Sequence, residues 1–269
     1  GLRFDYRNVD RGNEFSYKSF SDVSPKINLT FKRDNFSTWN FALSKGFRSP
    51  SLSELFLQYE SDYGLNTQGN PNLEPEQLYG LDISFDRSNK SNLTYSVSTF
   101  YYKYEDMIDF VYGLPVLALN RSDISSCGLE SNISYQLNTN FNLDLGYTYL
   151  RVNDINDIDP ILYRPNHKLI SSIKYKSKNI RHIISMRYQS DQDYQDFLSD
   201  EREYEGSEIK FPIEQLDSLI LFNYIGSYEL NNGDKISLKI SNLFDKQYEL
   251  IQDFPMPGRT ISLMYDKTF

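Results

Sequence analysis

The residues best suited to contact a ligand lie in the long polar segments of the sequence. Arg48 opens the first such segment, and aromatic side chains follow at Tyr59, Tyr63, Tyr194, Phe197 and Tyr204. Aromatic rings on exposed loops can stack on a large ligand, or they can pack against one another. Arg48 can likewise contact a ligand or fix the exit of its loop, because Pro50 has a fixed φ and holds Ser49 extended.

Other titratable side chains give weaker indications of a site. Asp154, Asp157 and Asp159 offer the oxygen ligands that Ca²⁺ prefers, but the glycine and the closing glutamate of an EF-hand loop are missing. His167 and His182 lie in segments predicted as strands, and no nucleophile partner for them is evident. The sequence therefore predicts no catalytic residues, no metal site and no cofactor, so we do not expect an enzyme.

The polar segments separate stretches in which apolar residues occupy every second position. In the clearest stretch these positions are Phe141, Leu143, Leu145, Tyr147 and Tyr149. The end of the chain, from Lys235 to Phe269, contains two more stretches of the same kind. Period-two alternation predicts strands with one apolar and one polar face, and the chain has about twelve of them.

The charged residues give an independent check on this phase. In the strands whose phase is clear, the polar face carries Asp82, Glu130, Asp144, Lys174, Arg187, Lys239 and Asp266. A basic residue that faces lipid at the midplane would cost about 2–4 kcal/mol. Lys267 takes the apolar side, but it lies next to the chain end, where we expect a membrane interface. This partition predicts an all-β fold, an antiparallel transmembrane β-barrel with lipid outside and water inside.

The connections between the strands alternate in length. Short turns are expected near residues 34, 89, 139, 178 and 232, and longer loops over about 8–21, 47–75, 153–163, 191–214 and 243–257. Short periplasmic turns and long extracellular loops are typical of bacterial outer-membrane barrels. We therefore expect the chain in a cell outer membrane, with the long loops outside.

The composition agrees with a membrane barrel of one domain, 1–269. The chain has 22 Tyr and 18 Phe but 1 Trp, and tyrosine suits both membrane interfaces because its ring is apolar and its hydroxyl is wet. No apolar run of about 18 residues predicts a transmembrane helix. The single Cys127 excludes an intrachain disulfide, and the net charge of −9 argues against nucleic acid as a partner.

Two other classes fit parts of this pattern. A soluble β-sandwich or β-helix has strands of about five to six residues, which are shorter than the strands expected here. A self-contained barrel of about twelve strands would act as a passive channel or an outer-membrane hydrolase. A hydrolase would need a Ser/His pair on one strand face, and the sequence offers no convincing one.

Three segments resemble the TonB-dependent outer-membrane receptors. FALSKGFRSPSLSEL (41–55) resembles their GFR-(A/S)-P-S-x-x-E-L stretch, and GNPNLEPE (69–76) resembles the GNPxLxPE sequence that precedes their next strand. NLFDKQY (242–248), followed by PGR (257–259) and a terminal aromatic residue, resembles their closing signature. The segment PNHK (165–168) and the spacing of the last hairpins look closest to the vitamin B12 (cobalamin) branch.

The resemblance implies a receptor that binds a scarce, large ligand with external loops. A plug domain would fill a barrel of about 22 strands, and the TonB complex of the inner membrane would pull on a segment before the plug to open a path. This chain has about twelve of those strands and no plug, so we expect it to be the C-terminal portion of such a barrel.

The resemblance also implies ligands and partners. Cobalamin is the expected ligand, a ferric siderophore is the alternative, and the loop residues named above would contact either one. Phe269, as a terminal aromatic residue, would belong to the signal read by the barrel-assembly machinery. Outer-membrane lipid would surround the strands, and lipopolysaccharide could meet the acidic loop 191–208 through divalent ions.

Overall fold

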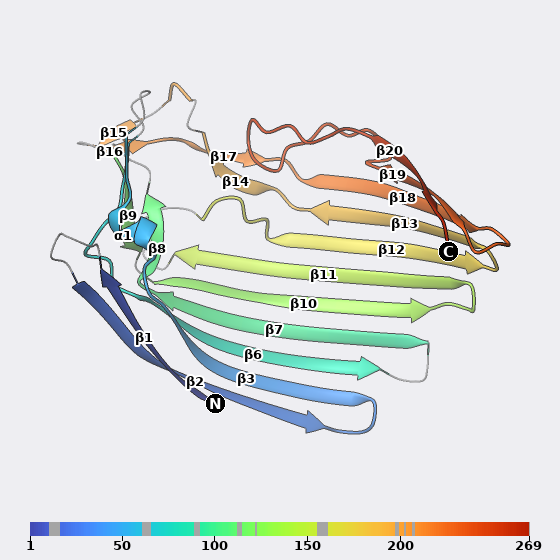
Figure 1. Ribbon diagram of the computed structural model, residues 1–269, viewed down its shortest axis with the longest axis horizontal. Coiled ribbons are helices and arrows are strands. Elements are labelled where there is room, and N and C mark those ends of the chain that lie inside the picture. The colour runs from blue at the N-terminus through green and yellow to red at the C-terminus, as the bar shows by residue number, and fades with distance from the viewer. Residues whose placement is uncertain are drawn as a thin grey trace.

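The computed structural model describes residues 1–10, 17–60, 66–88, 92–111, 115–121, 123–154, 161–196, 199–201, 203–205 and 208–268. One sheet of 12 strands dominates it (Figure 1). Its order is β1 (Leu2–Asp10), β2 (Tyr17–Lys32), β3 (Ser37–Arg48), β6 (Glu76–Ser88), β7 (Leu93–Glu105), β10 (Ile124–Gln136), β11 (Phe141–Asp154), β12 (His167–Ser177), β13 (Ile180–Gln189), β18 (Leu219–Glu229), β19 (Lys235–Ser241) and β20 (Thr260–Asp266).

Every neighbouring pair in this sheet is antiparallel, and β1 and β20 form its two edges. The prediction of about twelve antiparallel strands is therefore confirmed, and the sheet is a section of a β-barrel wall. Among the described residues, no helix is long and apolar enough to cross a membrane.

The long connections carry small elements of their own on one side of the sheet (Figure 1). These are α1 (Leu52–Phe56), the four-stranded sheet β4 (Gln58–Glu60), β5 (Asn66–Gln68), β9 (Val116–Arg121) and β8 (Met107–Val111), and the pairs β14 (Gln192–Gln195) with β17 (Ile213–Leu216) and β15 (Glu203–Glu205) with β16 (Glu208–Lys210). The end of the strands that bears these elements is called the loop side below, and the opposite end, where the short turns lie, is called the turn side.

The apolar face of the sheet is open to its surroundings. Tyr135, Leu143, Ile173 and Ile184 lie side by side on four neighbouring strands. Leu143 is 36% exposed and Leu263 is 76% exposed. A soluble monomer seldom exposes an apolar patch larger than a few hundred Å², so an apolar face that extends across the whole sheet fits lipid and argues against the soluble sandwich.

Aromatic side chains gather on this apolar face near the turn side. Trp39 and Phe85 lie 4.7 Å apart between ring centroids, and Phe85 and Tyr95 lie 5.8 Å apart. Phe141 and Tyr175 continue the row at 4.7 Å. Such a row matches the interfacial girdle of a membrane barrel, because its rings meet both hydrocarbon and the polar headgroups.

The two histidines also belong to aromatic rows of the apolar face. On the loop side, Nδ1 of His167 lies 2.8 Å from the Tyr147 hydroxyl oxygen. On the turn side, Nδ1 of His182 lies 2.8 Å from the Tyr224 hydroxyl oxygen. Both rings stack on neighbouring aromatic side chains, so each histidine has a packing role.

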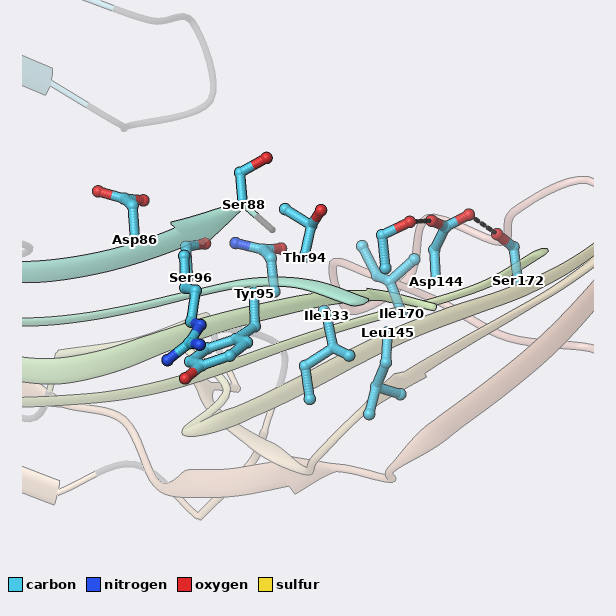
Figure 2. A pocket seen from close by; sticks show the side chains of 14 residues that line it. Asp86, Ser88, Thr94, Tyr95, Ser96, Ile133, Asp144, Leu145, Ile170 and Ser172 are labelled. Carbon is cyan, nitrogen blue, oxygen red and sulfur yellow. Dashed lines mark hydrogen bonds between the residues drawn. The ribbon is translucent and has the colours of Figure 1, made fainter. Parts of the chain in front are cut away.

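The seven charged residues that the sequence pattern predicts for the polar face all lie on it, because the strand register places their side chains on the same face of the sheet. Asp144 is the centre of one network there (Figure 2). Its carboxylate accepts hydrogen bonds from Ser134 at 2.8 Å and Ser172 at 3.2 Å, and it pairs with Lys174 at 2.7 Å. Figure 2 shows Leu145, the next residue, on the other side of the sheet.

The predicted short turns connect β2 to β3, β6 to β7, β10 to β11, β12 to β13 and β18 to β19. The loop predicted over about 8–21 was too long. β1 continues to Asp10 and β2 begins at Tyr17. The first part of β2, residues 17–25, pairs with β1, and its second part, residues 26–32, pairs with β3. The last predicted loop, 243–257, does separate β19 from β20.

Backbone geometry explains the closing signature. Asn242 and Asp245 have positive φ values of 52° and 57°, which asparagine and aspartate tolerate better than most residues. The Asp245 carboxylate accepts the backbone N–H of Arg259 at 2.6 Å. A Cβ on Gly258 would lie 2.6 Å from that carboxylate, so a side chain at this position would have to displace the carboxylate from its hydrogen bond with Arg259.

Candidate functional site on the loop side

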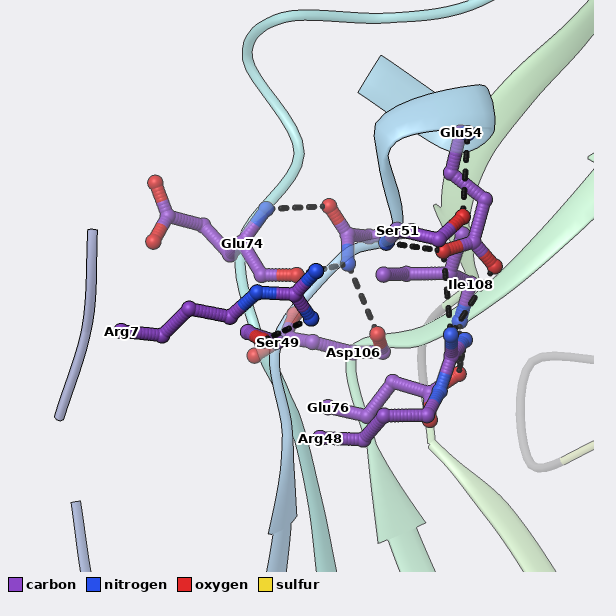
Figure 3. A network of polar contacts seen from close by, with 10 residues as sticks. Arg7, Arg48, Ser49, Ser51, Glu54, Glu74, Glu76, Asp106 and Ile108 are labelled. Carbon is purple, nitrogen blue, oxygen red and sulfur yellow. Dashed lines mark hydrogen bonds and ion pairs between the residues drawn. The ribbon is translucent and has the colours of Figure 1, made fainter. Parts of the chain in front are cut away.

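Arg48, at the loop-side end of β3, binds two carboxylates at once (Figure 3). Its Nη1 donates to both oxygens of Glu54 at 3.0 Å, and its Nε and Nη2 donate to the two oxygens of Glu76. This two-carboxylate arrangement is called the Arg48 clasp below. A planar guanidinium suits it because its five N–H groups form a rigid fork.

The clasp fixes α1 at its first turn. Ser51 caps the helix, and Ser51 and Glu54 exchange hydrogen bonds between side chain and backbone as a capping box. Burial alone would raise the pKa of Glu54, but the hydrogen bonds from Ser51 and from Arg48 hold that pKa below its usual value. Glu54 therefore stays charged, and it serves the helix and the clasp together.

The backbone at Gly69 passes very close to the end of this helix. A Cβ on Gly69 would lie 2.7 Å from the backbone nitrogen of Phe56, a distance that no side chain could relieve. The Gly69 N–H donates to Leu57 O at 2.7 Å, and the Asn70 N–H donates to Glu54 O at 2.8 Å. The resembling segments 41–55 and 69–76 are thus two halves of one structural unit.

A small hydrophobic core lies beneath the clasp. Its buried members come from α1, from the loop after β5, from β8 and β9, and from the first two strands: Leu55, Leu73, Ile108, Ala118, Val9 and Phe20. Buried leucine and isoleucine side chains each contribute roughly 1.5–3 kcal/mol. The loops here therefore form a packed body, which we call the loop-side core.

Polar contacts connect the surrounding segments to this core. The Asn120 amide accepts from the Glu74 N–H at 2.8 Å and donates to the carbonyls of Glu74 and Asp106 at 2.9 and 2.7 Å. The Ile108 N–H donates to Glu76 Oε1 at 2.8 Å, and Arg7 donates to Ser49 at 2.9 Å (Figure 3). Five segments far apart in the sequence are held together in this way.

The predicted contact residues have different surroundings. Tyr59, on β4, is 59% exposed and can meet a ligand. Tyr194, on β14, is only 5% exposed, and its hydroxyl donates to Glu214 on β17 at 2.7 Å. That hydrogen bond, together with burial, raises the pKa of Tyr194. Tyr59 and Tyr194 lie in different small sheets.

The other predicted positions are described only in part or not at all. Tyr63, Phe197 and Phe269 lie outside the described residues, as do Asp157 and Asp159. Tyr204 has its backbone in β15, and its side chain lies outside the described part. The proposed roles of these residues remain predictions.

The sequence did not reveal Glu76 as the second partner of Arg48, nor Asn120 as the residue that connects β9 to the segment before β6. Glu76 and Asn120 come from separate segments and carry no periodic signal. The sequence GNPNLEPE itself was the available indication, since its last glutamate, Glu76, is the second partner of Arg48. Glu54 and Glu76 are the last charged residues of segments 41–55 and 69–76, and they could have suggested carboxylate partners for Arg48.

A wide antiparallel sheet with one apolar face, one polar face and a packed loop side is the wall of a membrane β-barrel. The family model described as "TonB dependent receptor-like, beta-barrel" matches residues 1–243, and the chain belongs to this family. Members of this family are outer-membrane proteins, and their general role is transport.

Individual relatives are more distant. The chain is 24% identical over 175 residues to the "Iron-regulated outer membrane virulence protein" of Vibrio cholerae, a match that covers 58% of this chain and 27% of that protein. The fold of this chain is similar to that of "Copper transporter OprC", with a TM-score of 0.80 and 18% identity; the match covers 100% of this chain and 45% of the transporter.

The siderophore receptor PirA from Acinetobacter baumannii has a TM-score of 0.71 and 17% identity over 90% of this chain and 40% of its own. The chain thus spans about a quarter of the curated relative and less than half of the solved structures it resembles.

Proposed function

We propose that this chain is the C-terminal part of the barrel of an outer-membrane receptor that imports an iron chelate of the siderophore type. The observation that carries the proposal is family membership over residues 1–243. The names of the relatives support the ligand class, since they include an iron-regulated outer-membrane protein, a siderophore receptor and a ferric enterobactin receptor.

The sequence favoured cobalamin as the ligand, with a ferric siderophore as the alternative. No relative named above is described as a cobalamin receptor, so a ferric siderophore is the ligand that we propose first. Family membership likewise supports a receptor over a self-contained pore or a hydrolase.

The remaining parts of the receptor would lie outside this chain. The edges β1 and β20 would pair with the further strands of a barrel of about 22 strands. A plug domain would close the lumen, and the TonB complex would supply the work of opening. The extracellular side would be the loop side, because long loops face outward in bacterial barrels.

Within this chain, Tyr59 is the residue that we assign to ligand contact. It is exposed, and its ring can stack on the aromatic or conjugated groups that chelate iron. Arg48 serves as a positioning residue, because its guanidinium already binds Glu54 and Glu76. The Arg48 clasp would hold β4 and the loop-side core rigid, so that Tyr59 meets the ligand without a large ordering cost.

The test is a binding titration of the purified full-length receptor with ferric enterobactin and, in parallel, with cyanocobalamin. We expect saturable binding of the ferric chelate, and replacement of Tyr59 by alanine should weaken it about five- to tenfold. Tyr194→Phe is the matched control, because it removes only a hydroxyl that is already bonded to Glu214.

Binding of cyanocobalamin alone would overturn the ligand assignment. Binding of the ferric chelate with equal affinity by the Tyr59→Ala variant would remove Tyr59 from the site while leaving the receptor function in place.

A further inference from the structure

Eight neighbouring strands of the large sheet, from β6 to β19, form two groups of opposite charge on their polar face. Among the described residues of β6, β7, β10 and β11, it carries no lysine or arginine, and its carboxylates between the strand ends are Asp82, Asp86, Glu130 and Asp144. On β12, β13, β18 and β19 the same face carries one acid, Glu229, and the basic residues Lys168, Lys174, Lys176, Arg181, Arg187, Lys235 and Lys239. We call this second group the basic wall.

The basic wall extends over the full height of the sheet. Lys168 and Lys176 lie at the two ends of nine consecutive residues of β12, and a tilted strand of about 9–11 residues spans the hydrocarbon layer. The register sets Arg187 opposite Ile170 near the loop side and Arg181 opposite Lys176 near the turn side. Lys174 and Lys239 share a level between these two ends, so positive charges are spread from the loop side to the turn side, although the chain as a whole has a net charge of −9.

Most of these charges are unpaired within the part of the chain that the structure describes. Lys174 pairs with Asp144 at 2.7 Å, and Arg187 donates to the neutral Gln189 at 3.3 Å. Lys176, Arg181 and Lys239 are exposed and have no carboxylate within ion-pair distance among the described residues.

Lys176 and Arg181 even stand directly opposite each other on neighbouring strands. Like charges in that position destabilise a sheet, and an anion between them would offset the cost. Isoleucines such as Ile170 and Ile183 separate the charges, so the wall offers a series of weak positive sites and no single deep one. Conduction and release need several weak sites of this kind.

We propose that the basic wall is the surface along which an anionic metal chelate passes through the barrel lumen. The inference rests on the proposed function for the identity of the ligand, and it adds the route and the sign of the charge. A docked acidic protein segment is the other occupant that such charges could attract. The spread of exposed charges from the loop side to the turn side favours a moving small anion, because the centre of a docked protein interface is depleted of charged residues.

The first experiment measures the electrostatic potential at the basic wall, and it does not require the ligand to be known. In the full-length receptor with Cys127→Ser, one cysteine is introduced on the wall by Ser185→Cys or on the acidic half by Ser98→Cys. Each is treated with an anionic, a cationic and a neutral methanethiosulfonate reagent. We expect the anionic reagent to react about tenfold faster than the cationic one at position 185, and the order to reverse at position 98.

The second experiment measures transport of radiolabelled ferric enterobactin by cells that express the full-length receptor. The variant Lys176→Gln/Lys239→Gln removes two charges from the wall. Lys26→Gln/Lys32→Gln removes two exposed lysines from the polar face of β2 and is the matched control. We expect the wall variant to take up the chelate about tenfold more slowly, with surface binding within about twofold of wild type, and the control to match wild type.

Equal reagent preference at positions 185 and 98 would overturn the proposal whatever the ligand is. So would normal uptake by the wall variant together with a lower thermal midpoint, because that result would assign the wall to a docked protein segment. If wild-type cells bind no ferric enterobactin, the proposed function fails, and the reagent rates still decide whether the wall attracts anions.

Discussion

The Asp234 carboxylate, in the turn between β18 and β19, accepts hydrogen bonds from the Tyr265 hydroxyl and, at 3.0 Å, from the Thr268 backbone N–H. The Thr268 hydroxyl donates in turn to Gly233 O at 2.8 Å. One buried carboxylate thus connects the turn between β18 and β19 with the residues that follow β20.

This relationship predicts a pH-dependent loss of stability. The hydrogen bonds from Tyr265, Thr268 and Asn232 hold the pKa of Asp234 below its usual value. A lowered folded-state pKa stabilises the protein above the unfolded pKa of about 3.9, and the contribution is lost as pH falls through the folded pKa. Asp234→Asn in the full-length receptor should therefore lower the thermal midpoint at neutral pH, and the gap to wild type should close in acid.

Thermal unfolding in detergent across a pH series checks this prediction. Asp217→Asn is the control, because Asp217 is an exposed carboxylate on the loop side and should leave the midpoint unchanged. A gap between Asp234→Asn and wild type that does not change with pH would show that the charge of Asp234 is irrelevant.

The Arg48 clasp should depend on the shape of guanidinium. Lysine keeps the charge of Arg48 but cannot donate in parallel to both Glu54 and Glu76, so Arg48→Lys should cost roughly 1 kcal/mol of local stability. Hydrogen exchange of the Ile108 amide, which donates to Glu76, should become about fivefold faster. Arg3→Lys, in an exposed pair with Asp5, should leave that amide unchanged, and equal rates in the two variants would contradict the role of the clasp.

Gly69 should be intolerant of any side chain. Because a Cβ there would meet the backbone of Phe56 at 2.7 Å, Gly69→Ala should destabilise the loop-side core by about 1–3 kcal/mol. Gly46→Ala is the control, since its Cβ would lie 3.5 Å from Leu78, an ordinary contact. Limited proteolysis of the full-length receptor reports the difference, and equal resistance of the two variants would mean that the loop can move aside.

The sequence was sufficient to predict the sheet because the signal in each strand is local. Leu143 and Leu145 alternate with Asn142 and Asp144, and the register of the sheet only repeats that choice from strand to strand. The short turns follow for the same reason, since Asn, Gly and Asp mark them at fixed distances from the apolar runs.

The loop side could not be predicted in the same way because its contacts join distant residues. Arg48 and Glu76 are separated by 28 positions, and nothing periodic connects them. Tyr194 was expected to meet a ligand, but it is buried because β14 pairs with β17 across a long acidic segment. Tyr59 stays exposed in a similar sequence context, so composition alone could not separate the two tyrosines.

The partition between lipid and water gives the last prediction. Leu145 lies on the apolar face near the middle of β11, so Leu145→Arg should place a cation against hydrocarbon and cost about 2–4 kcal/mol. Ser98→Arg adds the same side chain on the polar face, beside Glu130 on the next strand, and should fold normally. The measurement is the free energy of unfolding of the full-length receptor in lipid vesicles. If both variants were equally stable, the apolar face would not be facing lipid, because a soluble environment would hydrate arginine on either side of the sheet.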